Sequence, residues 1–112
     1  MHGFWNPGNL TPRKIADGVT AKIVFGDKVM LSLVTMEPDS YMPVHFHPHE
    51  QMGMLVKGSV EFAIAEDMRP LSGNALFLVP GNTPHAFKAG PRGAVLIEAF
   101  SPPREDYMTP MG

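Results

Sequence analysis

Residues 41–58, with the sequence YMPVHFHPHEQMGMLVKG, hold three of the five histidines in the chain. His45 and His47 are two positions apart, so on an extended strand both imidazoles leave the same face and can converge on one ion. A helix would splay the same pair. Residues 48–50 break the strand pattern, which lets the chain turn and return a third donor, Gln51, toward the histidines. We interpret this segment as most of a metal site on an extended scaffold.

His85 is a candidate for the fourth ligand, because it follows the turn sequence VPGNTP at residues 79–84. Such a turn ends one strand and starts the next at a fixed offset, so it can aim a side chain accurately. The chain has no cysteine, which leaves imidazole and oxygen donors. His49 and Glu50 stay open as alternatives to Gln51. We expect one divalent transition metal, and nickel, zinc, manganese and iron are all compatible with these donors.

Short apolar runs separated by glycine and proline predict an all-β fold. Residues 20–37 contain two runs split by Gly26 and Asp27, as in a hairpin. Further strand candidates are residues 44–47, 51–58, 59–65, 75–79, 85–89 and 94–100. No window of helical length shows a clean apolar stripe. About eight short strands favour a jelly roll or small barrel, which is wide enough for a small ligand.

A chain of 112 residues is long enough for one domain with one core. We assign residues 1–19 to an extended N-terminal arm with at most one edge strand, residues 20–107 to the barrel, and residues 108–112 to a C-terminal tail. Phe4 and Trp5 are expected to anchor the arm. Apolar edge strands and this aromatic arm also favour a homodimer.

Charge and hydropathy narrow the possible partners. The net charge is −2 and the nine lysines and arginines are scattered, without the basic cluster that nucleic-acid binding requires. The N-terminus lacks a charged segment followed by an apolar one, and no apolar run approaches the length of a membrane span. We therefore expect a cytoplasmic protein that binds a small molecule, with neither nucleic acid nor a membrane as partner.

The ligand candidates resemble the two motifs of the small single-domain cupins. The first motif reads histidine, one residue, histidine, three residues, glutamate or glutamine, six residues, glycine, and is matched by His45, His47, Gln51 and Gly58. The second motif runs from a glycine through a proline and a turn to a histidine, and is matched by Gly73, Pro80, Gly81 and His85. Asn82 stands where the second motif has a glycine. The resemblance covers roughly residues 20–107 and implies a double-stranded β-helix, the cupin jelly-roll barrel, with a metal at these four donors.

The end of the chain is similar to that of pectin-degradation cupins that linearise unsaturated monouronates. Those proteins have an acid, one residue, FSP, one residue and REDY, and residues 98–107 read EAFSPPREDY. The acid is Glu98 here, where those cupins usually have aspartate. The resemblance implies that Glu98 is the general acid and base, that Arg104 binds the substrate carboxylate, and that Phe100 shapes the sugar pocket. Glu98 and Arg104 could instead form an ordinary ion pair.

The implied reaction opens a cyclic hemiacetal whose ring oxygen is attached to an enol carbon beside a carboxylate. It requires loss of the anomeric hydroxyl proton, stabilisation of the departing enolate, and protonation of C4. The neutral amide of Gln51 leaves the full charge on the ion, which favours anionic ligands. Two other functions stay open: an iron dioxygenase, and a non-catalytic module that binds a small sugar acid.

Overall fold

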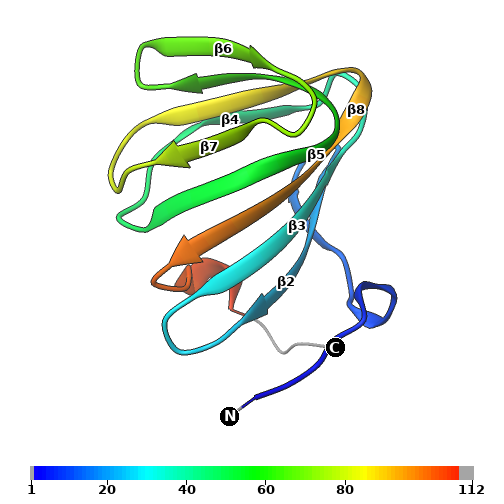
Figure 1. The fold of residues 1–112 in the computed structure, drawn as a ribbon, viewed down its shortest axis with the longest axis vertical. Helices are drawn as coiled ribbons and strands as arrows, with labels where there is room; N and C mark the ends of the chain where they lie inside the picture. The colour runs from blue at the N-terminus through cyan, green and yellow to red at the C-terminus, as the bar shows by residue number, and fades with distance from the viewer. Residues whose placement is uncertain (1, 109–112) are drawn as a thin grey trace.

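Two long antiparallel strands run through both layers of the fold (Figure 1). β5 spans Glu50–Ile64 and β8 spans His85–Ser101. Residues 50–58 of β5 pair with the second half of β8, and residues 60–64 pair with its first half. The computed structural model describes residues 2–108, and within this range all eight strands belong to one curled sheet.

The other strands attach to these two and define the layers. The first layer has the order β1-β2-β3-β8-β5-β7, and the second has the order β4-β8-β5-β6. The bounds are Arg13–Ala16 for β1, Val19–Phe25 for β2, Met30–Met36 for β3, Tyr41–His45 for β4, Asp67–Leu71 for β6 and Leu76–Val79 for β7. Two 3₁₀ turns, η1 at Pro7–Asn9 and η2 at Glu105–Tyr107, lie outside the sheet. In the part of the chain that the structure describes, neither η1 nor η2 is long enough to cross a membrane.

The core lies between the two layers and follows from strand alternation. On β3, buried residues at positions 30, 32, 34 and 36 alternate with more exposed ones. Phe62 packs at the centre, stacked on Phe87 with ring centroids 5.1 Å apart and tilted against Phe77 at 4.6 Å. The all-β, jelly-roll prediction is therefore confirmed, as is the hairpin expected within residues 20–37.

Gly58 bends β5 rather than ending it, which corrects the expectation of separate strands on either side. Gly58 and Gly93 have φ angles of +80° and +75°, a region that favours glycine. A Cβ on Gly58 would lie 2.0 Å from the Gly93 carbonyl oxygen, so the two backbones touch where the strands pass between layers. The segments predicted at residues 85–89 and 94–100 are likewise one strand, because β8 bends at the same place.

The N-terminal arm contains η1 and β1, and β1 joins the sheet beside β2. Lys22 Nζ donates a hydrogen bond to the Pro7 carbonyl at 2.8 Å, which ties η1 to β2. The expectation that Phe4 anchors the arm is wrong, because 95% of its surface is exposed. The tail assigned to residues 108–112 lies, apart from Met108, outside the described residues.

Candidate metal centre

His45, His47 and His85 converge at one end of the barrel. Their ring centroids are 4.2 Å apart for His45 and His85, 5.0 Å for His47 and His85, and 5.7 Å for His45 and His47. Each ring offers one nitrogen within 4.8 Å of the others. His45 and His85 are register partners across β4 and β8, whereas His47 lies two residues beyond the end of β4, so the strand predicted over residues 44–47 ends at His45. Val44 and Phe46 point outward and are largely exposed, as the predicted alternation requires.

Contact between two loops brings the histidines of both motifs together. The backbone N–H of Asn82 donates to the His47 carbonyl at 2.7 Å. A Cβ on Gly81 would lie 2.4 Å from the Pro48 carbonyl oxygen, so the loops pack backbone to backbone. Asn82 has a φ of +60°, a left-handed conformation that asparagine tolerates better than most residues. This explains how asparagine occupies the position where the motif has glycine.

Backbone carbonyls fix the tautomer of all three rings. A carbonyl oxygen only accepts hydrogen bonds, so the Nδ1 atom facing it carries the proton and donates. The acceptors are Pro43 for His45 at 2.8 Å, Thr83 for His85 at 2.8 Å, and His49 for His47 at 3.1 Å. In a neutral ring the lone pair then resides on Nε2, which is the form that binds a metal.

The electrostatics of the cluster favour neutral rings. Burial lowers the pKa of His45 and of His47, and it lowers the pKa of His85 to about 4. The nearby Arg104 cation lowers all three pKa values further. Nε2 of His85 is buried and has no hydrogen-bond partner among the described residues. A buried lone pair beside two similar ones fits a cation, since donors held about 2.1 Å from one ion lie roughly 3 to 4 Å apart.

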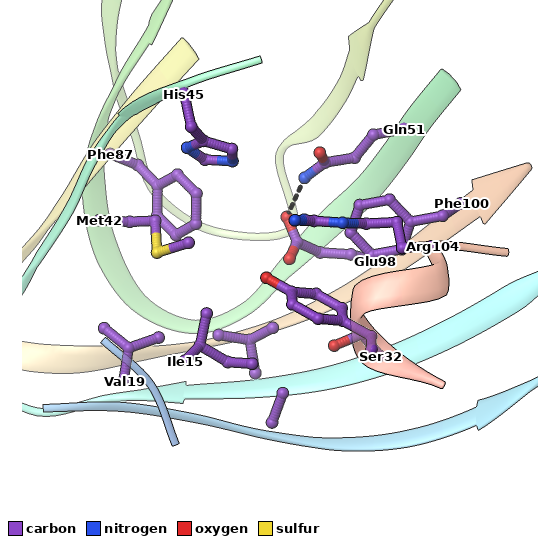
Figure 2. Close-up of a pocket in the computed structure, with 13 residues that line it drawn as sticks. Ile15, Val19, Ser32, Met42, His45, Gln51, Phe87, Glu98, Phe100 and Arg104 are labelled. Carbon is purple, nitrogen blue, oxygen red and sulfur yellow. Dashed lines mark hydrogen bonds between the residues drawn. The ribbon is translucent and has the colours of Figure 1, made fainter. Parts of the chain in front are cut away.

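Gln51 bridges the histidine cluster and Glu98. It is 2% exposed, and its Oε1 lies 3.1 Å from Nε2 of His47. Its Nε2 donates to Oε2 of Glu98 at 2.5 Å, the dashed line in Figure 2. Two lone pairs face each other between Gln51 and His47, an arrangement that a cation between them would stabilise.

Glu98 is a buried acid whose proton affinity suits proton transfer near neutral pH. It is 4% exposed, and burial raises its pKa to about 7, although the Gln51 hydrogen bond and the Arg104 charge act in the opposite direction. Its register partner across β3 and β8 is Ser32, whose buried hydroxyl has no partner in the described chain.

Arg104 is held in the turn that precedes η2. Its Nη2 and Nε donate to the Asp106 carboxylate at 2.9 and 3.3 Å. The guanidinium lies over the Tyr107 ring at 3.9 Å and over Phe100 at 5.3 Å. The ordinary ion pair considered for Glu98 therefore forms between Arg104 and Asp106 instead. Because a guanidinium has five N–H donors, others stay available after this pairing.

A small cavity of about 20 Å³ lies against these groups, and Figure 2 shows its lining. Its polar lining residues are Ser32, His45, Gln51, Glu98, Arg104 and Tyr107. A cavity of this volume holds about one water molecule.

The alternative donors lie outside the cluster. His49 is buried and its ring centroid is 5.3 Å from that of His47, but its Nε2 faces the Glu105 carboxylate at 3.3 Å and is not part of the three-histidine group. Glu50 is exposed at the start of β5. Among the described residues, the group of metal-capable side chains is His45, His47 and His85.

Comparison with known proteins defines the class of this fold and site. Residues 32–99 match the family described as "Cupin domain", which is more than half of the chain. The protein belongs to the cupin family.

Relatives include a pectin-degradation protein and two solved cupins. The chain is 29% identical over 97 residues to the pectin degradation protein KdgF of Dickeya dadantii, covering 85% of this chain and 88% of that one. The structure of KdgF from a Halomonas species superposes with a TM-score of 0.89 at 25% identity, covering 96% of this chain and all of the other. An RmlC-like cupin from Shewanella frigidimarina gives the same score and identity, with coverages of 96% and 97%. The predicted homology to pectin-degradation cupins is confirmed.

Several residues of this site are not predicted from the sequence. Ser32 carries a usable signal, because it is a polar residue at an inward position of a strand whose other inward residues, at positions 30, 34 and 36, are apolar. Tyr107 and Asp106 lie within the REDY sequence but received no role. Nothing local indicated Arg13, whose Nη2 donates to the Asp106 carbonyl at 2.6 Å from 93 residues away.

We predict that Glu98→Gln stabilises the metal-free protein more at pH 8.5 than at pH 5. The pKa of Glu98 is about 7 in the folded protein against an ordinary 4.5, so its contribution to stability is full below 4.5 and is lost as the pH rises through 7. A neutral glutamine avoids that loss, and the gain approaches about 3 kcal/mol at the higher pH. Urea unfolding with chelator measures it. Glu61→Gln, at an exposed position of β5, is the control, and an equal gain for Glu98→Gln at both pH values would contradict the prediction.

Proposed function

We propose that this cupin binds one divalent transition metal and opens the ring of a 4,5-unsaturated monouronate to the open-chain keto acid. The observation that carries the proposal is the link through Gln51, which joins a three-histidine cluster to a buried acid with a pKa near 7. The names of two relatives, the KdgF proteins of Dickeya dadantii and Halomonas, support it, since the first is a pectin degradation protein.

His45, His47 and His85 would hold the ion through Nε2, and Gln51 would hold it through Oε1. Three imidazoles and a neutral amide suit nickel, zinc, manganese or iron, so the donor set leaves the identity open. When bound, the ion supplies Lewis acidity toward the oxygen on which negative charge develops.

Glu98 is the proposed proton carrier. Its pKa near 7 lets the carboxylate accept the anomeric hydroxyl proton and the acid return a proton to C4 at neutral pH. Gln51 orients the carboxyl by donating to Oε2. The longer side chain of glutamate, relative to the aspartate usual in such cupins, reaches this amide from a position on β8 facing the barrel interior.

Arg104 and Phe100 are the proposed substrate-binding residues. The guanidinium would donate to the uronate carboxylate, for which its planar fork is well suited. Phe100 packs edge-on against His47, with ring centroids 5.8 Å apart, so its ring lies beside the metal cluster. The cavity beside these groups, which Ser32, Gln51, Glu98 and Arg104 line, marks where the reacting end of the substrate would lie.

The cytoplasmic location and the small-molecule partner expected from the sequence are part of this proposal. We also propose a homodimer, because large apolar side chains of the first layer, Leu31, Met52, Leu76 and Leu78, are 41–76% exposed.

Metal addition should raise the melting temperature of the chelated protein, and His85→Ala should abolish the rise. Binding to the folded state alone adds about 4 kcal/mol at a thousand times Kd, which corresponds to many degrees for a domain of this size. Calorimetry with nickel, zinc, manganese and anaerobic ferrous iron measures the effect. His2→Ala removes an exposed histidine and serves as the control. An unchanged rise in His85→Ala would contradict the ligand assignment.

The metal-loaded protein should accelerate the loss of ultraviolet absorbance of an unsaturated monouronate. Glu98→Ala and Arg104→Ala should each lower kcat/KM by about 100-fold or more, because they remove the proton carrier and the carboxylate contact. Elemental analysis should show that both variants retain metal, and Glu61→Ala is the matched control. No acceleration by the loaded wild type would sink the proposal. Oxygen uptake would favour the dioxygenase, and tight binding of the uronate without turnover would favour a binding module.

A further inference from the structure

The guanidinium of Arg13 lies at the turn that carries Arg104. Arg13 is the first residue of β1, and its Nη2 donates to the Asp106 carbonyl at 2.6 Å. Its Cζ lies 5.7 Å from the centroid of the Tyr107 ring. Its Nη1 is buried although the residue as a whole is only partly buried, whereas arginines usually keep this end of the side chain in water. The N-terminal arm therefore makes a specific contact with η2 through this side chain.

Asp106 and Tyr107 are also the residues that hold Arg104. The Asp106 carboxylate accepts hydrogen bonds from Arg104 at 2.9 and 3.3 Å, while the carbonyl of the same residue accepts the bond from Arg13. The Tyr107 ring lies against both guanidinium groups, and the Arg104 Cζ is 3.9 Å from its centroid. Arg13 and Arg104 thus share these two partners. A shift of η2 would displace both contacts of Arg104 at once.

The turn η2 is too short to hold its own position. It is a 3₁₀ turn of three residues, Glu105–Tyr107, none of which is buried. Turns of this length are not stable in isolation, so contacts with the rest of the fold decide where they lie. Tyr107 packs edge-on against Phe100 with ring centroids 6.2 Å apart. The contact of Glu105 with His49 at 3.3 Å involves a carboxylate that is 77% exposed, so water weakens it.

We propose that Arg13 is a positioning residue for the substrate-binding site, which holds η2 so that the remaining donors of Arg104 face the cavity. Arg104 lines this cavity and Arg13 does not, so Arg13 acts through Arg104 rather than on the substrate. The effect on the substrate rests on the proposed function, whereas the attachment of η2 does not. A carboxylate contact is present in the ground state and in the transition state, so its misplacement weakens binding more than it slows the chemical step.

Steady-state kinetics of Arg13→Ala with an unsaturated monouronate tests the effect on binding. We expect KM to rise about tenfold with kcat within about twofold of the wild type, because η2 shifts while the proton carrier stays in place. Arg13→Lys should recover part of the affinity, since an ammonium can still donate to the Asp106 carbonyl. Lys14→Ala is the matched control with wild-type KM. It removes the same charge from the next residue of β1, where the side chain is 69% exposed and paired with Asp17.

Amide hydrogen exchange measured by NMR tests the attachment of η2. The N–H groups of Tyr107 and Met108 donate to the carbonyls of Arg104 and Glu105 at 3.0 and 3.2 Å, so both report on the turn. When the turn loosens, these amides should exchange roughly tenfold faster in Arg13→Ala. They should exchange at the wild-type rate in the Lys14→Ala control.

Three results would overturn the role of Arg13. They are an unchanged KM in Arg13→Ala, unchanged amide exchange in η2, and a fall in kcat with KM unchanged. If circular dichroism shows that Arg13→Ala is unfolded, Arg13→Met takes its place, because it keeps the aliphatic part of the side chain and removes the donors. A wild type inactive on uronates refutes the proposed function, and the amide exchange still decides whether Arg13 holds the turn.

A separate observation concerns the hydroxyl of Ser32. This side chain is 1% exposed, faces inward from β3 opposite Glu98, and its Oγ has no hydrogen-bond partner among the described residues. Buried hydroxyls are normally bonded to protein groups or to ordered water. The cavity of about 20 Å³ that Ser32 and Glu98 both line has room for one water, together with polar groups to hold it.

We propose that one ordered water bridges Ser32 Oγ and the Glu98 carboxyl, which makes Ser32 a positioning residue for Glu98. In Figure 2, Ser32 and Gln51 lie on opposite sides of this carboxyl. The Gln51 amide donates to Oε2, so the bridge would hold the carboxyl from the other side and fix its direction. The catalytic consequence rests on the proposed function, whereas the water itself does not.

A high-resolution crystal structure and steady-state kinetics of Ser32→Ala test this role. We expect the water in the wild type, its loss in Ser32→Ala, and a fall in kcat of roughly tenfold with KM nearly unchanged, because the acid is misaligned while the substrate contacts remain. Ser59→Ala, on β5 away from the cavity, is the control. An empty wild-type cavity, or equal kcat values in the wild type and Ser32→Ala, overturns the proposal. If the wild type does not act on uronates, the proposed function fails and the crystallographic result still decides the water.

Discussion

The antiparallel pairing of β5 with β8 is the constraint on which the site depends. It sets Gln51 opposite Phe100, Gly53 opposite Glu98 and Ile64 opposite His85. A slip of one residue along either strand would turn Gln51 or Glu98 to the outer side of the sheet. The close approach of Gly58 and Gly93 fixes the place where both strands change layers, so the register holds on both sides of the bend.

The side-chain amide of Gln51 lies between the histidine cluster and Glu98. On one side of Gln51 are rings kept neutral by burial and by the Arg104 charge; on the other is an acid that burial makes hard to ionise. The Arg104 charge lowers the pKa of His47, of His85 and of Glu98. Its guanidinium is paired with Asp106 in its own turn. The groups proposed to bind a metal, to move a proton and to bind an anion are therefore close together. They come from different segments of the chain.

The sequence predicted those parts of the protein that local spacing encodes. His45, His47 and His85 could be found because strand alternation and a rigid turn decide where their side chains point. The sequence predicts a break at Gly58 where the strand only bends, since a glycine between apolar runs has the same pattern in a turn and in a bulge. The contact of Arg13 with Asp106 joins positions 93 residues apart, and the exposure of Phe4 depends on what the folded surface offers; neither has a local signature.

The three hydrogen bonds from Nδ1 to backbone carbonyls have a consequence for how an ion is captured. Each acceptor lies two residues from its histidine, so the rings are oriented by their own segments rather than by the ion. The side-chain entropy that a flexible imidazole would surrender on coordination, on the order of 0.5–1.5 kcal/mol for an immobilised side chain, is already lost on folding. An ion whose preferred bond lengths match this fixed spacing gains the most binding free energy from it. The folded chain therefore discriminates between ions of similar intrinsic affinity.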